Sequence, residues 1–596
     1  MGRIAVIDFG GQYTQLIARR VRELSVYSEI LPADTPASAL SCYDGIILAG
    51  GPASVYDKGA PHCDPDIFEM GKPVLGICYG MQLMAHRYGG RVSPAEIREY
   101  GDTSVQVKKR SGLFSGMDDL ESVWMSHGDS VLSSGIGGFE PLAVTDGGIL
   151  AAMGNAGKGL YGVQFHPEVR DTPKGMAVLG NFVLGICNAT QDWTMEDYVK
   201  TSTGQISRQV GNGHALSLIS GGVDSAVATS LVYRAIGPSQ HCLYVDTGLM
   251  RLNESKDVEN ALRSAGVNNL HVSDWSDYFL ERLAGVRDPQ QKRQIIGDAF
   301  VHVLEKEMRR LGLPDDSYVV QGTLYPDRIE SGIGTADLIK THHNWGPMEE
   351  RRKRGLVVEP LASLFKDEVR SVGRLLGLPD EIIYRHPFPG PGLAARVVCN
   401  YHMPENFEKL KQDVSGIACE HGFQSSVLPI ATVGVQGDNR TYRNLVLISG
   451  ERDWDGMRGV RKAIVTSQPV NRIAFVLADN EPRRSFEIGI NTETLDILRT
   501  ADNLATIALK EYGLYDAVSQ MPVVLFPDYE NGRERGPAIG LRPVVTDDFM
   551  TARPTIPGRH VPWEYFDDVS QRIGELGVGK VVLDITDKPP GTIEWE

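Results

Sequence analysis

What this sequence lacks already narrows the classes of protein to which it can belong. Its seven cysteines are scattered over 596 residues, with no close pair at the spacing of a zinc site or a disulfide framework. No apolar run is long enough to span a bilayer, and Met1–Gly10 has neither the basic stretch nor the small-residue cleavage site of a secretory signal. We therefore expect a cytoplasmic protein with no membrane partner.

Positive charge is also scarce. The chain has 60 Lys and Arg against 76 Asp and Glu, which gives a formal net charge of −16. Such a protein repels a phosphate backbone, and no long basic face is visible, so we expect no nucleic-acid partner. Small anions must then be bound at local sites. The length exceeds that at which a single core stops growing, which predicts several domains.

Apolar strand patterns alternate with helical patterns from the N-terminus onward, as at Arg3–Phe9, Gly45–Leu48 and Pro73–Ile77. This rhythm predicts an α/β fold with a mostly parallel sheet. A second series starts at Ala215–Ile219. It follows the polar stretch Ala189–Gly213, which shows no strong apolar period and is interpreted as a connector. Two α/β domains in tandem are therefore expected.

The Pro/Gly cluster His386–Leu393 marks the next boundary or a shaped loop, because it cannot continue a helix or a central strand. Beyond it, two stretches look alike, at about residues 430–480 and 537–596. Each is predicted to be strand, helix, strand, and the second has a strand at Leu541–Thr546 and a helix near Trp563–Leu576. The likeness indicates either an internal duplication or only the general similarity of such units.

The segment Gly76-Ile-Cys-Tyr-Gly80 lies between an apolar strand and the helical pattern Met81–Tyr88. A tight turn at this place lifts the sulfur of Cys78 above the sheet at a helix N-terminus, where the helix field favours the thiolate. Attack on an amide carbonyl then becomes feasible. The alternative for a single cysteine is a packing role in the core.

A nucleophile of this kind needs a base and an oxyanion site. The segment Gln164-Phe-His-Pro-Glu168 offers His166 as the base, with Glu168 suited to orient the imidazole. The backbone N–H groups of Tyr79 and Gly51 are the predicted oxyanion donors. A lone histidine could equally satisfy only a local hydrogen bond.

A second glycine-rich turn lies between the strand Ala215–Ile219 and the helical stretch Ala226–Ala235. Free N–H groups and the helix dipole at such a turn favour bound phosphate, and serine hydroxyls add donors. The lysine of a Walker loop is missing, and a plain turn without a ligand is the alternative. The predicted phosphate-binding residues are Ser220, Gly221, Gly222, Val223, Asp224, Ser225 and Ala226.

In this order and spacing, the motifs of residues 1–190 resemble the class I glutamine amidotransferases, with Cys78, His166 and Glu168 matching the catalytic triad. The Ser-Gly-Gly-x-Asp-Ser loop resembles that of ATP-pyrophosphatases, which adenylate an oxygen and release pyrophosphate. With both halves in one chain, the sequence resembles the glutamine-hydrolysing GMP synthetase family over nearly its whole length. The segments Gly434–Asp438 and Lys588–Glu596 also carry this resemblance.

The resemblance implies a fold and a reaction. It implies an α/β glutaminase domain at 1–190, an α/β ATP-pyrophosphatase domain of the adenine nucleotide alpha hydrolase type at 191–395, and an α+β C-terminal domain at 396–596. The implied substrates are XMP, ATP and glutamine. Mg²⁺ is expected to accompany ATP, with no tightly bound cofactor and no predicted metal-binding residues. The reaction adenylates XMP, and ammonia from glutamine then displaces AMP to give GMP.

The resemblance also implies further site residues. Lys340, His342 and His343 would lie on a lid over the phosphates, for which the alternative is a solvated polar loop. The tail Lys588–Glu596 is expected to be well ordered only on bound substrate. The residues expected to bind XMP are Arg293, Asp438, Gln520, Lys588 and Glu594.

One departure concerns about residues 444–535, which shorter members of the family lack. If this stretch adds an internal copy of the domain that pairs two chains in those members, the protein would be a monomer; the alternative is a homodimer through the C-terminal domain. Two rival functions stay open at this point: amidation or thiolation of a different carbonyl, and a non-catalytic glutamine sensor.

Overall fold

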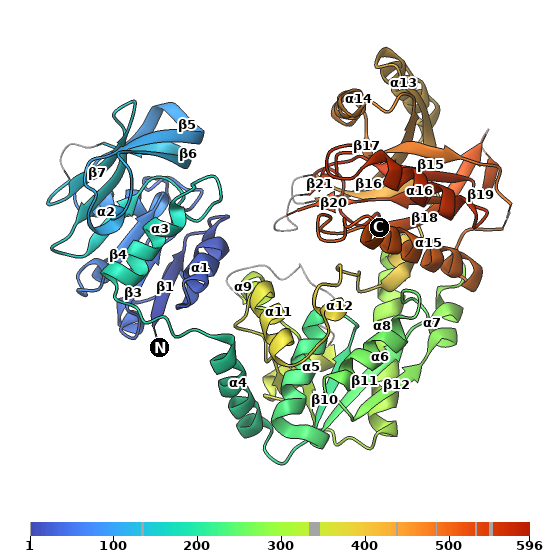
Figure 1. Ribbon diagram of the computed structural model, residues 1–596, viewed down its shortest axis with the longest axis horizontal. Helices are drawn as coiled ribbons and strands as arrows, with labels where there is room; N and C mark the ends of the chain where they lie inside the picture. The colour runs from blue at the N-terminus through green and yellow to red at the C-terminus, as the bar shows by residue number, and fades with distance from the viewer. Residues whose placement is uncertain are drawn as a thin grey trace. The chain divides into compact units, whose positions relative to one another are not determined.

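The computed structural model describes residues 2–132, 136–332, 346–436, 439–483, 486–530, 533–546 and 552–596. The described residues form two compact units (Figure 1). The first comprises those within 2–202, 323–332 and 362–368, and the second those within 203–322, 346–361 and 369–596. Two short segments assigned to the middle domain therefore pack with the N-terminal unit. The three-domain division stays a prediction.

The first unit is built on a mixed sheet of strand order β2-β1-β3-β4-β9-β8-β7-β5-β6. Strands from β2 to β9 in this order pair in parallel, and those from β9 to β6 pair antiparallel. The strands are β1 Arg3–Asp8, β2 Tyr27–Pro32, β3 Gly45–Leu48, β4 Val74–Ile77, β5 Val92–Val107, β6 Leu120–Val131, β7 Glu140–Thr145, β8 Leu150–Asn155 and β9 Leu160–Val163.

Helices cover both faces of the parallel part, which is why its strands are apolar almost without interruption. Helices α1 and α3 pack with Val6 and Ile47 on one face, whereas α2 packs with Ile7 and Leu48 on the other. The α-helices of this unit are α1 Thr14–Glu23, α2 Tyr79–Arg87, α3 Gly175–Gly180, α4 Met195–Val210, whose last turns belong to the second unit, and α9 Tyr325–Gly332.

The segments 323–332 and 362–368 are anchored to the first unit by a buried arginine of α1. The Arg22 guanidinium is 2.8 Å from the Glu368 carboxylate and lies about 5 Å from the ring centres of Tyr325 and Phe365. Cation–π contacts and a buried ion pair with a single guanidinium therefore hold two segments distant in sequence. No pattern in the sequence predicted these contacts of Arg22 with the two segments.

The expected connector 189–213 contains the helix α4. Val199, Ser202, Ile206 and Val210 are buried along one side of it. This stripe has helical spacing, but the small serine weakens its apolar signal. The stretch interpreted as a connector therefore contains a helix that the sequence did not predict, and the boundary between the two units falls within it.

The second unit begins with a parallel sheet of strand order β12-β11-β10-β13-β14. Its strands are β10 Ala215–Ile219, β11 Gln240–Asp246, β12 Leu270–Asp274, β13 Tyr318–Val320 and β14 Val357–Val358. Its helices are α5 Val223–Ile236, α6 Glu254–Ser264, α7 Ser276–Leu283, α8 Pro289–Arg310, α10 Gly346–Lys353, α11 Lys366–Leu375 and α12 Asp380–Ile383, of which the first turn of α11 belongs to the first unit.

The C-terminal part contains a mixed sheet of strand order β15-β16-β17-β22-β19-β18. Its strands are β15 Gln424–Gln436, β16 Asn439–Ser449, β17 Val470–Asp479, β18 Val523–Glu530, β19 Arg533–Leu541 and β22 Lys580–Asp584, and β20 Val544–Val545 pairs with β21 Arg553–Pro554 beside it. The helices are α13 Phe407–Glu420, α14 Trp454–Ser467, α15 Thr492–Glu511 and α16 Trp563–Gly574. The strand expected at Leu541–Thr546 is thus split between β19 and β20.

The two halves of this sheet have the same design. In each half a helix precedes an antiparallel hairpin, and a second helix then leads to a strand parallel to the hairpin's second strand. The halves meet where β17 and β22 pair antiparallel. Four buried positions of α13 recur in α15 at one constant spacing: Phe407, Leu410, Val414 and Ala418 correspond to Leu498, Ala501, Ala505 and Leu509.

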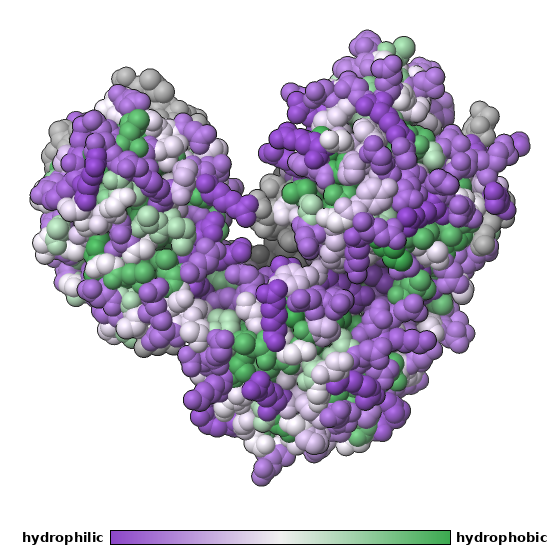
Figure 2. All heavy atoms as spheres, viewed as in Figure 1, coloured by the Kyte–Doolittle hydropathy of each residue, from purple (hydrophilic) through white to green (hydrophobic). Residues whose placement is uncertain are grey.

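The molecular surface mixes hydrophilic and hydrophobic residues, as the composition of the chain leads one to expect. On the face seen in Figure 2, hydrophobic residues form small patches among hydrophilic ones. Within the described ranges, no helix combines the length and the apolar character needed to cross a membrane.

Candidate active sites

Cys78 occupies a strained turn between strand β4 and helix α2. Its backbone has φ 52° and ψ −108°, in the positive-φ region that residues with a side chain rarely adopt. The turn is tight enough to require glycine at position 80, where a Cβ would lie only 2.7 Å from the Cβ of Leu48. The structure therefore confirms the strand–turn–helix geometry predicted for this segment.

His166 lies beside this turn in a buried pair with Glu168. Its Nδ1 is 2.7 Å from Oε1 of Glu168, and the exposed fractions of the two residues are 5% and 0%. The backbone of His166 is fixed on both sides: its N–H donates to the carbonyl of Trp124 at 3.0 Å, and its carbonyl accepts from the Thr172 hydroxyl at 2.7 Å. The ring can therefore rotate little.

The electrostatics of the pair favour a protonated imidazole. Burial lowers the pKa of His166, but the Glu168 carboxylate and a hydrogen bond with Cys78 outweigh it and raise the pKa to about 10. The imidazole is thus placed to hold the proton of the thiol and to donate it later to a leaving amine.

The two predicted oxyanion donors lie at the same turn. Tyr79 is the first residue of α2, so its N–H has no acceptor within the helix. Gly51 is close by, since a Cβ added to it would be 3.4 Å from the ring of Tyr79. The neighbouring Gly50 would similarly place a Cβ 3.3 Å from the His166 ring and 3.7 Å from the Cβ of Cys78. The predicted residues of the first site are therefore brought together.

The second glycine-rich turn lies at the carboxyl end of strand β10, whose neighbours β11 and β13 lie on opposite sides. In parallel sheets this position is a usual place for nucleotides. Gly221 has φ +80°, and Gly222 caps helix α5. The hydroxyls of Ser220 and Ser225 are 3.2 Å apart, and the Ser225 hydroxyl accepts from the Ser220 N–H at 3.2 Å. Ser220 and Gly222 are exposed, so the turn is open to a ligand.

The arginine that directly precedes the Pro/Gly cluster supports this turn. Arg385 donates to the Gly221 carbonyl at 3.4 Å and pairs with Glu254 at 2.9 Å. A Cβ on Gly221 would lie 2.9 Å from the Glu254 carboxylate. The cluster is therefore a shaped loop next to the second glycine-rich turn, which was one of the two interpretations open from the sequence.

Of the residues predicted for XMP, the structure joins Gln520 and Glu594 directly. The Gln520 amide donates to Oε1 of Glu594 at 3.3 Å. Arg396 holds the same carboxylate with two parallel hydrogen bonds, of 3.2 Å from Nε and 3.0 Å from Nη2, and donates from Nη1 to Asp502 at 3.1 Å. Asp502 in turn lies 3.4 Å from Arg251. A buried network thus fixes Glu594.

The other predicted XMP and lid residues are less directly connected. Arg293 lines a narrow space with Lys292 and Glu596, two residues from Glu594. Lys588 pairs its backbone with Ala552, at 2.8 and 3.3 Å. Four predicted residues lie outside the described ranges: Lys340, His342, His343 and Asp438.

The tail 588–596 is held by the protein's own groups. Trp595 is fully buried, and Arg472 of β17 donates to the carbonyls of Thr592 and Glu594 at 2.9 and 3.1 Å. Lys292 pairs with Glu596 at 2.6 Å in the interior. The tail thus has intramolecular contacts of its own, and its ordering by bound substrate stays a prediction.

Sequence reasoning missed Arg396, Asp502 and Arg472. Each is a buried charge on a segment distant in sequence from the tail that it supports. The available signal was weak: a charged residue at an apolar position of a helix or strand pattern requires a partner, but the pattern does not name it.

The fold and the buried Cys-His-Glu arrangement define the first unit as a class I glutamine amidotransferase domain, and the family model described as "Glutamine amidotransferase class-I" matches residues 5–186. The model described as "GMP synthase C terminal domain" matches residues 508–595.

Relatives named GMP synthase (glutamine-hydrolyzing) match along the chain. Those of Heliobacterium modesticaldum and Carboxydothermus hydrogenoformans are each 42% identical over 604 residues, covering 100% of this chain and 99% of the relative. That of Geobacillus kaustophilus is 45% identical over 504 residues, covering 80% of this chain and 98% of the relative. The chain belongs to the GMP synthase (glutamine-hydrolyzing) family.

Proposed function

We propose that this protein makes GMP from XMP, ATP and glutamine, releasing AMP, pyrophosphate and glutamate. The observation that carries the proposal is the occurrence, in one chain of this family, of a Cys-His-Glu site and an open glycine-rich turn at a helix N-terminus. The first can release ammonia from an amide, and the second can hold the phosphates of an activating nucleotide. Both belong to one nitrogen-transfer reaction in the cytoplasm.

In the glutaminase step, Cys78 attacks the glutamine carbonyl while His166 holds the thiol proton. The backbone N–H groups of Tyr79 and Gly51 stabilise the oxyanion. His166 then gives its proton to the departing ammonia, and water releases glutamate from the thioester. Glu168 keeps the imidazole oriented and supports its positive charge.

In the synthetase step, the turn Ser220–Ala226 binds the phosphates of ATP through its N–H groups and hydroxyls. The C2 oxygen of XMP attacks the α-phosphorus, pyrophosphate leaves, and ammonia then displaces AMP. Gln520 and Glu594 are proposed to recognise the purine and ribose, and Arg293 and Lys588 the phosphate, with Asp438 as a further contact. Lys340, His342 and His343 would form a lid that excludes water.

Magnesium is proposed to enter with ATP. Among the residues that the structure describes, no three His, Cys, Asp or Glu side chains are grouped as a metal site. Held by the nucleotide's phosphates, the ion would offset the charge of the leaving pyrophosphate.

The repeated design of the C-terminal sheet supports an internal duplication and a monomer. Two halves of one chain meet through antiparallel β17 and β22, as two copies related by a two-fold axis would meet. A matching relative covered at 98% by only 80% of this chain shows that shorter family members exist. Light scattering should give the mass of one chain; a homodimer independent of concentration would contradict this.

Substitution of Cys78 by Ala tests whether the glutaminase step and the synthetase step use separate sites. GMP synthesis from glutamine should be lost, whereas synthesis from added ammonium should be retained, because only the nitrogen source has changed. Loss of both would contradict the proposal.

Pyrophosphate release separates this function from amidation or thiolation of a different carbonyl. Pyrophosphate should appear when XMP and Mg-ATP are mixed, and not when other carbonyl acceptors replace XMP. A purely sensory protein would release none.

A further inference from the structure

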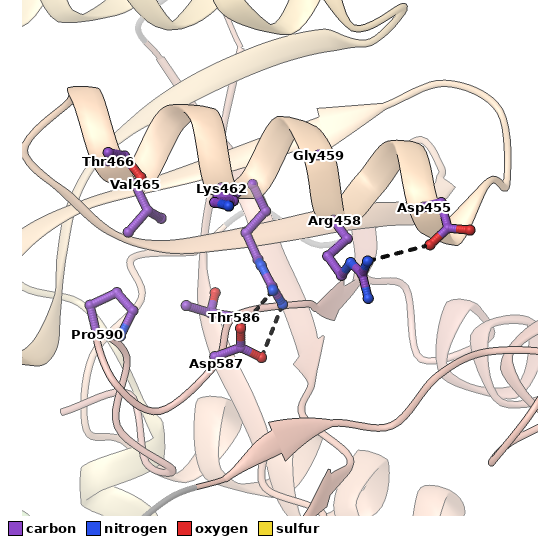
Figure 3. A pocket seen from close by; sticks show the side chains of 10 residues that line it. Asp455, Arg458, Gly459, Lys462, Val465, Thr466, Thr586, Asp587 and Pro590 are labelled. Carbon is purple, nitrogen blue, oxygen red and sulfur yellow. Dashed lines mark hydrogen bonds and ion pairs between the residues drawn. The ribbon is translucent and has the colours of Figure 1, made fainter. Parts of the chain in front are cut away.

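A pocket of about 810 Å³ in the second unit lies between helix α14 and the segment that follows strand β22 (Figure 3). Arg458, Arg461 and Lys462 line it from the helix, and Thr586 and Asp587 line it from the other side. Among the residues predicted for XMP that the structure describes, none lines this pocket. Pro590 of the tail lines it as well, so the pocket adjoins the predicted XMP residues without including one of those described.

Two of the three cations are available to a ligand. Lys462 has no ion-pair or hydrogen-bond partner within the described part of the chain. Arg458 is 4.0 Å from Asp455, and both side chains are more than half exposed, so this pair contributes little. The Asp587 carboxylate is neutralised by Arg461, whose Nη2 is 2.6 Å from Oδ2. Asp455 lines the pocket too, so three cations face two carboxylates and the wall keeps one net positive charge in a protein of net charge −16.

Packing does not require these cations, as the second repeat shows. Three buried positions of α14 recur in α16 at one constant spacing: Met457, Val460 and Ile464 correspond to Phe566, Val569 and Ile573. At the same spacing the cations Arg458, Arg461 and Lys462 correspond to Asp567, Ser570 and Gln571. The same kind of helix thus packs equally well with acidic or neutral residues there.

An asparagine takes up part of the corresponding space beside α16. Asn480 packs against Gly574 at the end of that helix, where an added Cβ would be 3.1 Å from its side chain. In the first repeat this space is an open pocket, whose lining includes three cations and the carboxylates of Asp455 and Asp587. The difference between two otherwise equivalent halves therefore indicates a ligand rather than a by-product of the fold.

We propose that this pocket binds a small phosphate-bearing molecule, with Arg458 and Lys462 as its charged contacts. Guanidinium and ammonium groups that lack strong partners are the donors that phosphate oxygens prefer. The volume admits a molecule of nucleotide size.

The pocket is joined to Lys588 through Arg461. This side chain donates to the Ile585 carbonyl at 2.6 Å and to Oδ1 of Asp587 at 3.1 Å, so it holds the segment that leads into Lys588. A bound phosphate competes with Asp587 for Arg461 and loosens that segment. This coupling rests on the proposed function, in which Lys588 binds XMP, whereas ligand binding itself does not.

Equilibrium titration of the full chain with inorganic pyrophosphate tests the site. The proteins compared are the wild type, Arg458→Gln with Lys462→Gln, and a control of equal charge change, Arg309→Gln with Lys411→Gln. The two control side chains are 76% and 40% exposed and lie on other helices. Whether or not the turn at Ser220 also binds pyrophosphate, the wild type and the control should show one more site per chain than the pocket variant. Equal stoichiometry in all three would overturn the proposal.

Kinetics then test the coupling. Added pyrophosphate should raise the KM for XMP about threefold or more in the wild type and the control, and less than half as much in the pocket variant. An equal rise in all three would overturn the coupling while the titration still decides the site. Failure of the wild type to form GMP would instead refute the proposed function and leave the titration unaffected.

Discussion

Replacement of Arg396 by Met tests whether the buried network around Glu594 positions it for substrate. Arg396 is fully buried and makes three hydrogen bonds to the carboxylates of Glu594 and Asp502. Methionine fills much of the same volume but leaves both carboxylates without this cation. The variant therefore removes charge and orientation with little loss of packing.

The structure sets the size of the effect. Removal of one partner from a buried ion pair costs about 3–5 kcal/mol. Asp502 keeps Arg251 at 3.4 Å, and the Glu594 side chain is 20% exposed, so we expect the lower end, about 3 kcal/mol. A domain of the size predicted for residues 396–596 loses about 2–4 °C of melting temperature per kcal/mol. The melting temperature of this part should therefore fall by about 6–12 °C.

The functional consequence should be selective. Because Glu594 loses its bidentate partner, the KM for XMP should rise about tenfold, the value of one charged hydrogen bond, while the KM for ATP and glutamine hydrolysis change little. Pyrophosphate release at varied XMP and ATP measures this. Arg396→Lys should be intermediate, because lysine keeps the charge but not the planar fork.

A matched control is the exposed pair of Arg452 and Asp567. Arg452→Met should shift stability by less than about 1 kcal/mol and leave both KM values unchanged. If Arg396→Met behaved like this control, or raised the KM for XMP and ATP together, the positioning role of Arg396 would be refuted.

Two further predictions concern the first unit. His166 has a folded pKa raised from 6.5 to about 10, so its stabilisation is complete below about pH 6.5 and is lost as the pH rises toward 10, by up to about 1.4 kcal/mol per pH unit. Glu168→Gln should flatten this slope in thermal melts between pH 6.5 and 8.5; an unchanged slope would exclude the pair as its cause. Gly80→Ala should abolish soluble expression of the folded unit, because the new Cβ overlaps Leu48, whereas Gly89→Ala, at φ +81° with nothing within 4 Å, should cost only about 1 kcal/mol. Equal yields and melting temperatures would show that the turn at Cys78 can widen.

Local chemistry made the two anion-stabilising turns predictable. Glycines on either side of Cys78, and the run from Ser220 to Ser225, restrict the backbone within a few residues, so their geometry follows from the local sequence. The same holds for the α/β class, because apolar periodicity reports the strands and helices directly. The stretch that forms α4 was missed since its buried side includes a serine and so lacks a clear apolar period.

Only the tertiary structure decided which distant charges meet. Arg22 joins α1 to Glu368, Arg396 pairs with both Asp502 and Glu594, and Arg472 donates to the tail. In each of these contacts the arginine and its partner are more than a hundred residues apart in the sequence. Local patterns carry no information on such pairs. The sequence by itself determined the chemistry of the turns and the order of the elements. The buried ion pairs that hold the tail 588–596, and the open pocket beside α14, depend on how the repeated halves pack and differ, and that is a property of the folded chain.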